Sequence, residues 1–351
     1  MARKTEKTEN RLNYGAAVRR LQEEGPRKLY LLWGPEDYLR EDYLAKLKKL
    51  CLPEGEDSFS YKRLDGPDLE PRLLRQAVDA MPFLTDRSFV EIRNAELNKL
   101  SDPEGCLRVL EDIPDCCTVV LVQSAGFEPD GRLKLIKRLR ELSVELRFSQ
   151  QAQGMLIDWI SRRFAAEGKR IDLEAAQRLI FISGDLMSGL IPEIQKVAAY
   201  AREEKVSLAD VEAVANHIPE AVIFDMTDQI SQKRYNTAIA ILAELLADRS
   251  NEPIPMLAML GVQMRKLYAA RLALEEKLGS SYVMEACGIK HEFIAKKLMQ
   301  SARGFSMDQL QRAVELCAET DYRIKSSGLD DRELLKEAIV RIAAGEGHVS
   351  S

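Results

Sequence analysis

Five short apolar runs, separated by stretches with helical periodicity, constrain the fold of this chain most. The runs span residues 29–33, 59–64, 89–93, 118–123 and 144–148. Between them, apolar residues recur every three or four positions, as in Leu39, Tyr43, Leu47 and Leu50, a spacing typical of amphipathic helices. The run 118–122 reads T-V-V-L-V, as a strand buried on both faces would. Strands that alternate with helices predict a parallel sheet with crossover helices.

After residue 149 we expect helices and no further strands. Asp172 is a candidate N-cap, Ser207 with Asp210 resembles a weakened capping box, and another helix is expected to follow Pro192. The predicted fold class is therefore α/β plus all-α. The predicted divisions are an extension with a first helix (1–28), an α/β domain (29–149), a small helical domain (150–220), a larger helical domain (221–346) and a tail (347–351).

The turn after the first predicted strand begins at Gly34, where a nucleotide-binding α/β domain carries its phosphate-binding loop. When the pattern G-x-x-x-x-G-K-[ST] starts at Gly34, Leu39 replaces the second glycine, Arg40 the lysine and Glu41 the hydroxyl residue. Leu39 has a side chain where the backbone should approach phosphate, and Arg40 lacks the compact ammonium group of lysine. Glu41 cannot supply the hydroxyl that binds Mg²⁺ in that loop.

Glu36 and Asp37 add negative charge where the negatively charged phosphates would lie. We therefore predict that this turn has lost ATP binding. The alternative is an unrelated α/β domain with an ordinary strand–helix turn. Both interpretations exclude a P-loop ATPase.

Other patterns of catalytic or metal-binding residues are weak, so we predict no catalytic residue, no metal and no cofactor. His217, His291 and His348 are far apart and form no H-x-x-x-H pattern, and the six cysteines are scattered without C-x-x-C spacing. The net charge of −5 does not suit a protein that binds nucleic acid alone. No run approaches 18 apolar residues and the first ten residues are polar, so we expect no membrane span and a cytoplasmic protein.

The segment Met81-Pro82-Phe83-Leu84 places large apolar residues on a connection between a helix and a strand. A helical pattern ends at Met81, because Pro82 disfavours helix at the residue before it. Phe83 and Leu84 have two possible roles. They pack under the sheet, or they form an exposed plug that enters a pocket of another protein.

Several stretches together resemble the delta subunits of the bacterial DNA polymerase III clamp loader. They are residues 29–39, 80–87, 158–160, 193–200, 223–226 and 321–326, and the similarity extends from about residue 29 to residue 344. The resemblance implies a RecA-like AAA+ domain, a helical lid and a helical collar. In active relatives the lid carries a sensor arginine after a glycine, and Met187 stands near that place here.

The resemblance also implies a function and partners. Phe83 and Leu84, with Met81 and Pro82, would enter a pocket on the sliding clamp (beta) and open it by binding. The collar would assemble with the ATPase subunits (gamma/tau) and delta-prime into a hetero-oligomer, the polymerase III holoenzyme, a DNA-directed DNA polymerase as an assembly. DNA would be contacted within that complex alone. Two alternatives remain open: an ATP-hydrolysing AAA+ protein with an atypical loop, and a AAA+-derived adaptor outside replication.

Overall fold

The computed structural model describes residues 14–52, 59–82, 85–247 and 252–345, and the chain divides into two compact units. The first unit comprises Met1–Gln151 and Leu186–Ser188, and the second comprises Ala152–Asp185 and Gly189–Ser351. The predicted division of the second unit into a lid (150–220) and a collar (221–346) stays a prediction.

A parallel five-stranded sheet forms the centre of the first unit, with the strand order β2-β3-β4-β1-β5. The five predicted strands are confirmed, with ends that differ by one or two residues. They are β1 (Leu29–Trp33), β2 (Tyr61–Asp65), β3 (Ser88–Arg93), β4 (Cys117–Val122) and β5 (Val144–Arg147). β1 lies between β4 and β5, with Leu29 opposite Val119 and Tyr30 opposite Val144. This is the RecA-like order that the resemblance implies.

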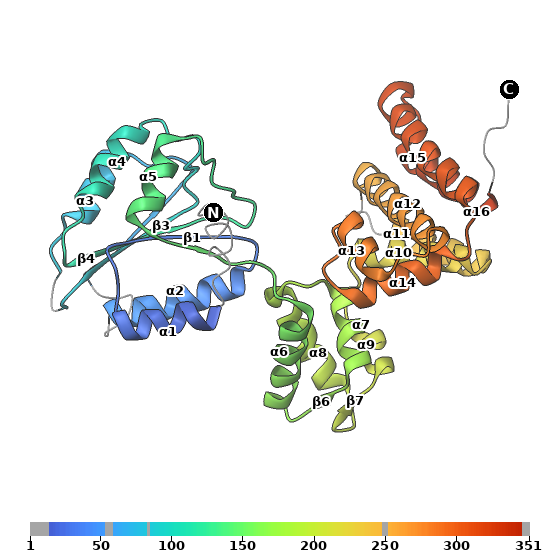
Figure 1. Ribbon diagram of the computed structural model, residues 1–351, viewed down its shortest axis with the longest axis horizontal. Helices are drawn as coiled ribbons and strands as arrows, with labels where there is room; N and C mark the ends of the chain where they lie inside the picture. The colour runs from blue at the N-terminus through green and yellow to red at the C-terminus, as the bar shows by residue number, and fades with distance from the viewer. Residues whose placement is uncertain (1–13, 53–58, 83–84, 248–251, 346–351) are drawn as a thin grey trace. The chain divides into compact units, whose positions relative to one another are not determined.

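Helices cover both faces of this sheet. Figure 1 shows α1 (Tyr14–Glu24) and α2 (Asp37–Cys51) on one face, and α3 (Pro71–Val78), α4 (Pro103–Glu111) and α5 (Lys134–Leu142) on the other. Every residue of β1 and β4 is buried, which explains their continuous apolar runs, because a strand covered on both faces needs apolar side chains on both.

The second unit is mainly helical, but it contains one short pair of strands that the sequence does not predict. β6 (Arg170–Ile171) and β7 (Lys205–Val206) form a two-residue parallel ladder. The helices are α6 (Gln153–Ala166), α7 (Leu173–Ser183), α8 (Met187–Tyr200), α9 (Leu208–Val214), α10 (Pro219–Ser231), α11 (Tyr235–Ala247), α12 (Pro253–Glu275), α13 (Ser280–Cys287), α14 (Glu292–Ala302), α15 (Met307–Ser327) and α16 (Asp331–Ala344). The expectation that strands end with residue 149 is wrong for these two pairs of residues, which are too short for a periodic signal.

Capping residues set several of these helix ends as predicted. The Asp172 carboxylate accepts the Ala175 N–H at the start of α7, and Ser207 with Asp210 forms a complete capping box at α9. The helix expected after Pro192 instead begins at Met187, with Pro192 inside it. Buried Leu190 and Ile194 on either side of the proline give tertiary packing that offsets the backbone hydrogen bond that Pro192 cannot donate.

α12 forms the centre of the C-terminal helices and contacts α10, α13, α14, α15 and α16. Its buried residues include Met256, Leu257, Leu260 and Met264. A helix with apolar residues on several faces is surrounded by neighbours rather than lying on a surface. Met256 and Met264 are therefore core residues, and Met259 on the same helix is partly buried.

Candidate functional site

The turn after β1 is too short to be a phosphate-binding loop. Pro35 and Glu36 alone separate Gly34 from α2, which begins at Asp37. In the pattern G-x-x-x-x-G-K-[ST], four residues separate the glycines between strand and helix. Leu39, which aligns with the second glycine, already lies inside α2 and is buried.

The backbone N–H groups of this turn have acceptors within the chain. The Glu36 N–H donates to the Phe148 carbonyl at 3.0 Å, and the Asp37 N–H to the Pro35 carbonyl at 3.1 Å. The Tyr38 N–H donates to the Asp37 carboxylate at 3.0 Å. Helix N-termini bind phosphate through N–H groups that lack intrahelical partners. At this terminus, three such groups are already occupied.

Gly34 and Arg40 have structural roles in the same turn. Gly34 has φ +116°, and a Cβ there would lie 2.5 Å from the Phe148 carbonyl oxygen, so glycine is required for β1 to lie against the end of β5. Arg40, which aligns with the phosphate-binding lysine, is buried and donates to the Gly34 carbonyl at 2.8 Å. Burial lowers the pKa of Arg40. Its guanidinium therefore closes the turn instead of pointing into a ligand site.

Hydrogen bonds from residues 187 and 188, which belong to the first unit, stabilise the negative charge expected at this turn. Glu36 is fully buried, and its carboxylate accepts the Met187 N–H at 3.2 Å. Ser188 Oγ donates to the Asp37 carboxylate at 2.7 Å. The residue near the expected sensor position thus binds a carboxylate through its backbone.

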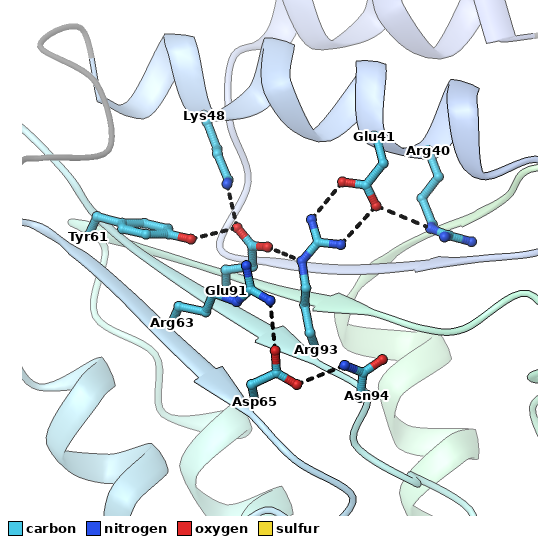
Figure 2. A network of polar contacts seen from close by, with 9 residues as sticks. All are labelled: Arg40, Glu41, Lys48, Tyr61, Arg63, Asp65, Glu91, Arg93 and Asn94. Carbon is cyan, nitrogen blue, oxygen red and sulfur yellow. Dashed lines mark hydrogen bonds and ion pairs between the residues drawn. The ribbon is translucent and has the colours of Figure 1, made fainter. Parts of the chain in front are cut away.

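Glu41, which aligns with the Mg²⁺-binding hydroxyl, binds an arginine from a neighbouring strand (Figure 2). Arg93 ends β3 and donates through Nη1 at 2.9 Å and Nη2 at 2.6 Å to the two Glu41 oxygens. Paired planar contacts of this kind are among the stronger ionic hydrogen bonds in proteins. The Arg93 guanidinium, a cation of the protein itself, therefore binds the Glu41 carboxylate.

The same arginine also binds Glu91, a buried carboxylate of β3. The Glu91 side chain is 0 % exposed and accepts hydrogen bonds from Lys48, Arg93 and, at 3.0 Å, the Tyr61 hydroxyl (Figure 2). Burial raises the pKa of Glu91, but the hydrogen bonds from Lys48 and Arg93 outweigh it, and the pKa is lowered overall. We call Glu41, Lys48, Tyr61, Glu91 and Arg93 the crevice network.

These residues do not match what a magnesium–nucleotide complex needs. The turn has no long glycine-rich loop, its N–H groups have acceptors, and Glu41 replaces the hydroxyl. Across the described residues, no group of three or more His, Cys, Asp or Glu side chains could hold a metal ion. Two histidines contact single acids, His291 with Asp185 and His217 with Glu212, and His348 lies outside the described residues. That the chain uses no metal stays a prediction.

The described residues of the predicted plug, Met81 and Pro82, come before β3, at the edge of the sheet opposite to the turn after β1. α3 ends at Val78, so the prediction that the helix continues to Met81 is wrong by one turn, because the backbone leaves the helix at Asp79. Met81 is 80 % exposed and Pro82 is half-buried. Phe83 and Leu84 lie outside the described residues, so their role stays a prediction.

One exposed residue at this edge was not predicted. The apolar run 59–64 predicts Phe59 in a strand, but β2 begins at Tyr61. Phe59 lies in the turn before β2, with 78 % of its surface exposed. One feature of the sequence separates Phe59 from the buried strand residues: it is the first residue of its apolar run and has polar neighbours.

A RecA-like parallel sheet, with a short strand–helix turn after β1, and a long helical C-terminal part define a AAA+-like fold. Two family models match the chain: the DNA polymerase III delta subunit at residues 30–149, and the C-terminal domain of that subunit at residues 220–342. The chain belongs to the DNA polymerase III delta subunit family.

Relatives agree with this assignment. DNA polymerase III subunit delta of Bacillus subtilis (strain 168) is 25 % identical over 320 residues, covering 88 % of this chain and 90 % of the relative. A probable DNA polymerase III subunit delta of Aquifex aeolicus (strain VF5) is 24 % identical over 326 residues, covering 88 % and 89 %. The structure of the Bacillus subtilis DNA clamp loader delta protein is similar in fold, with a TM-score of 0.55, 21 % identity and coverage of 95 % of this chain and 100 % of that one.

Among the described residues, none of the helices combines the length and the apolar composition that a membrane span requires.

Proposed function

We propose that this chain, a clamp-loader delta subunit, binds the sliding clamp through residues 81–84 and opens it without hydrolysing ATP itself. One observation carries the proposal. The chain's own side chains and carbonyl groups occupy the carboxyl edge of the sheet, where a AAA+ protein binds nucleotide. At the amino edge of the same sheet, Met81 is exposed beside the two predicted plug residues.

Binding energy would replace hydrolysis as the source of clamp opening. Burying Phe83 and Leu84 in an apolar pocket would contribute about 1.5–3 kcal/mol each. A bound protein shifts a closed–open equilibrium only by the difference between its affinities for the two forms. The plug therefore opens the clamp to the extent that the pocket accepts it better in the open ring.

Membership in the family supports a proposal for the partners. The collar (221–346) would assemble with the ATPase subunits (gamma/tau) and delta-prime, whose bound ATP would control when the plug is available. Exposed apolar residues on the collar helices support an interface there: Tyr322 on α15 is 71 % exposed, and Val340 on α16 is also exposed. DNA contact would occur within this hetero-oligomer, in the cytoplasm.

Specific observations weigh against the two alternatives. An ATP-hydrolysing AAA+ protein with an atypical loop conflicts with the two-residue turn and its occupied N–H groups. An adaptor outside replication conflicts with the two matched family models, which together span more than half of the chain.

The test is a titration of the purified sliding clamp with the full chain and with Phe83→Ala combined with Leu84→Ala. We expect the double variant to bind more than 2 kcal/mol more weakly, because truncating anchors in an apolar pocket removes most of their binding energy. Unfolding by urea should be unchanged within error if the two side chains face solvent in the free chain.

Leu173→Ala is a matched control, since Leu173 is an exposed leucine of α7 in the second unit. This control should bind the clamp like the unchanged protein. Equal affinity of the double variant and the unchanged protein would refute the plug.

A further inference from the structure

A cavity in the second unit has no role in the proposed function. Its volume is about 210 Å³, and residues of α7, α10, α12 and α14, with the segments next to these helices, line it. α10 contacts the other three helices. An apolar cavity of about 150 Å³ holds a benzene molecule, whereas sites for drug-sized ligands have volumes of about 300–1,000 Å³. The cavity therefore has room for one branched or aromatic side chain, but not for a nucleotide.

The walls of the cavity are apolar and already fixed in the free chain. The rings of Phe181 and Phe224 meet edge to face, with their centroids 4.9 Å apart. Both rings are buried, and two cations cover Phe181, with Arg178 at 5.1 Å and Lys297 at 4.5 Å from its centroid. A ligand loses little free energy in ordering walls that are already in place. The apolar lining includes Ile180, Phe181, Ile218, Phe224, Ile294 and Leu298.

A histidine in the lining has one buried nitrogen atom without a hydrogen-bond partner. His291 is the N-cap residue of α14 and is 3 % exposed, and its Nε2 lies 3.2 Å from the Asp185 carboxylate. The hydrogen bond with His291 is the main cause that lowers the pKa of Asp185, so this carboxylate is ionised and can only accept. Nε2 therefore carries the proton, and Nδ1 of the neutral ring is an acceptor. Among the described residues, nothing donates to this buried Nδ1.

Two side chains of opposite charge line the same cavity. Glu220 lies in the first turn of α10 and is exposed, and Lys266 of α12 is half-buried. Neither has an ion-pair or hydrogen-bond partner within the part of the chain that the structure describes. The exposure of Glu220 indicates that the cavity opens to solvent at the start of α10. A carboxylate and an amine beside apolar walls match a ligand that carries both an ammonium group and a carboxylate on an apolar body.

We propose that this cavity binds a free apolar amino acid of the size of leucine or phenylalanine. The ligand side chain packs between the apolar walls, its ammonium group pairs with Glu220 and donates to His291 Nδ1, and its carboxylate pairs with Lys266. The ligand contacts α10, α12 and α14 together, so its binding stabilises the second unit. This inference is independent of the proposed function, because the sheet of the first unit contributes nothing to the cavity.

Ligands with a single charge suit these residues less well. A simple carboxylate would lie near Asp185 and Glu220 with one lysine of the lining to balance them. A simple amine would satisfy Glu220 and His291 but leave Lys266 beside a second cation. An amino acid supplies one charge for each side of the opening, which is why the proposal commits to this class.

The test is a calorimetric titration of the full chain with L-leucine, with the melting temperature followed in parallel. We expect saturable binding and a melting temperature that rises with leucine concentration. Leucinamide lacks the carboxylate and isocaproate lacks the ammonium group, so each should bind at least about tenfold more weakly because one charge-assisted contact is lost. Glycine lacks the apolar side chain and should not bind measurably.

Two variants locate the binding. Ala221 lines the cavity and is buried, so Ala221→Leu fills the space and should abolish leucine binding. Overfilling can destabilise a core, and Lys266→Met therefore provides a second, milder change that keeps the apolar stem. It should weaken leucine binding about tenfold and leave the weak binding of leucinamide unchanged, because leucinamide has no carboxylate. Lys99→Met is the control, since Lys99 is an exposed lysine of the first unit, and it should bind leucine like the unchanged chain.

Three results would overturn the inference. The first is that neither leucine nor phenylalanine binds the unchanged chain saturably. The second is that leucinamide binds as tightly as leucine, which would assign the cavity to the amino terminus of a peptide. The third is that leucine binds Lys266→Met and a folded Ala221→Leu variant as it binds the unchanged chain, which would place the ligand elsewhere.

Discussion

The two edges of the sheet in the first unit differ in chemistry. At the carboxyl ends of the strands, Glu41 pairs with Arg93, the last residue of β3. From Arg93 the crevice network continues along the strand to Glu91, which pairs with Lys48. At the amino ends of β2 and β3, the exposed side chains include Phe59 and Met81. Ligands of open α/β sheets usually bind at the carboxyl ends of the strands. In this chain, charged side chains at the carboxyl edge bind one another, and apolar side chains are exposed at the opposite edge.

Under the proposed function, this difference explains how a AAA+ fold loses ATP hydrolysis and keeps its frame. In a AAA+ fold without a bound nucleotide, the charged side chains that would contact the nucleotide lack a partner. Replacing the hydroxyl by Glu41 and placing Arg93 opposite it neutralises the site from within. Under the proposed function, the frame is stable without a nucleotide, and the other edge of the sheet binds the clamp.

The largest expected effect comes from removing the buried carboxylate of the crevice network. Glu91→Ala leaves Lys48 and Arg93, whose side chains are mostly buried, without their shared partner. Loss of one partner in a buried ionic cluster costs about 3–5 kcal/mol. The free energy of unfolding, measured with urea, should therefore fall by about that amount. Glu96→Ala is the control, because Glu96 and Lys99 form an exposed pair worth less than about 1 kcal/mol. Equal effects of the two variants would show that the crevice network does not stabilise the sheet.

The same carboxylate predicts an acid dependence. The pKa of Glu91 lies below its ordinary value of 4.5 in the folded protein. A lowered folded pKa means that the carboxylate stabilises the fold at pH values above 4.5, and this contribution is lost as pH falls through the lower folded value. The difference in stability between the unchanged protein and Glu91→Gln should therefore be constant near neutral pH and narrow below pH 4.5.

The sequence predicts the sheet well and the crevice network poorly, and the reason is the range of the interactions. The β1 and β4 runs are continuous and apolar because both faces are covered, which any window of the sequence reveals. Arg93 and Glu41 are 52 positions apart, and no local pattern connects them. A charged residue inside the run of β3, S-F-V-E-I-R, is the available signal, since a buried charge needs a partner.

At the turn after β1, the pattern identifies the residues but not the geometry. The substitutions at Leu39, Arg40 and Glu41 are visible in the sequence. The early start of α2 at Asp37 and the contact of Gly34 with Phe148 depend on the end of β5. The sequence predicts Phe59 in a strand because its apolar run begins two residues before β2 does.

A smaller effect should come from the ion pair between Glu41 and Arg93. Glu41 is partly exposed, so we expect a coupling energy of about 1 kcal/mol in a double-mutant cycle of Glu41→Ala and Arg93→Ala. The measurement is urea unfolding of the four proteins. The matched cycle uses Glu104 and Lys134, a pair with both side chains exposed, where the coupling should be smaller. A larger coupling in the exposed pair would contradict the view that the carboxyl edge is closed by its own charges.

The smallest expected effect is that of magnesium and ATP, which should not change the melting temperature of the chain. A ligand at 100 times its dissociation constant would stabilise the fold by about 2.7 kcal/mol, a shift of about 5–10 °C for a unit of this size. A shift of that size would overturn the closed crevice and favour the ATP-hydrolysing alternative. Arg40→Lys with Glu41→Ser sharpens the test, because it restores the matching side chains and leaves the short turn. We expect this variant to bind no nucleotide either, since the N–H groups of Glu36 and Asp37 keep their acceptors in the chain. Binding by the variant alone would mean that the side chains, rather than the length of the turn, exclude the nucleotide.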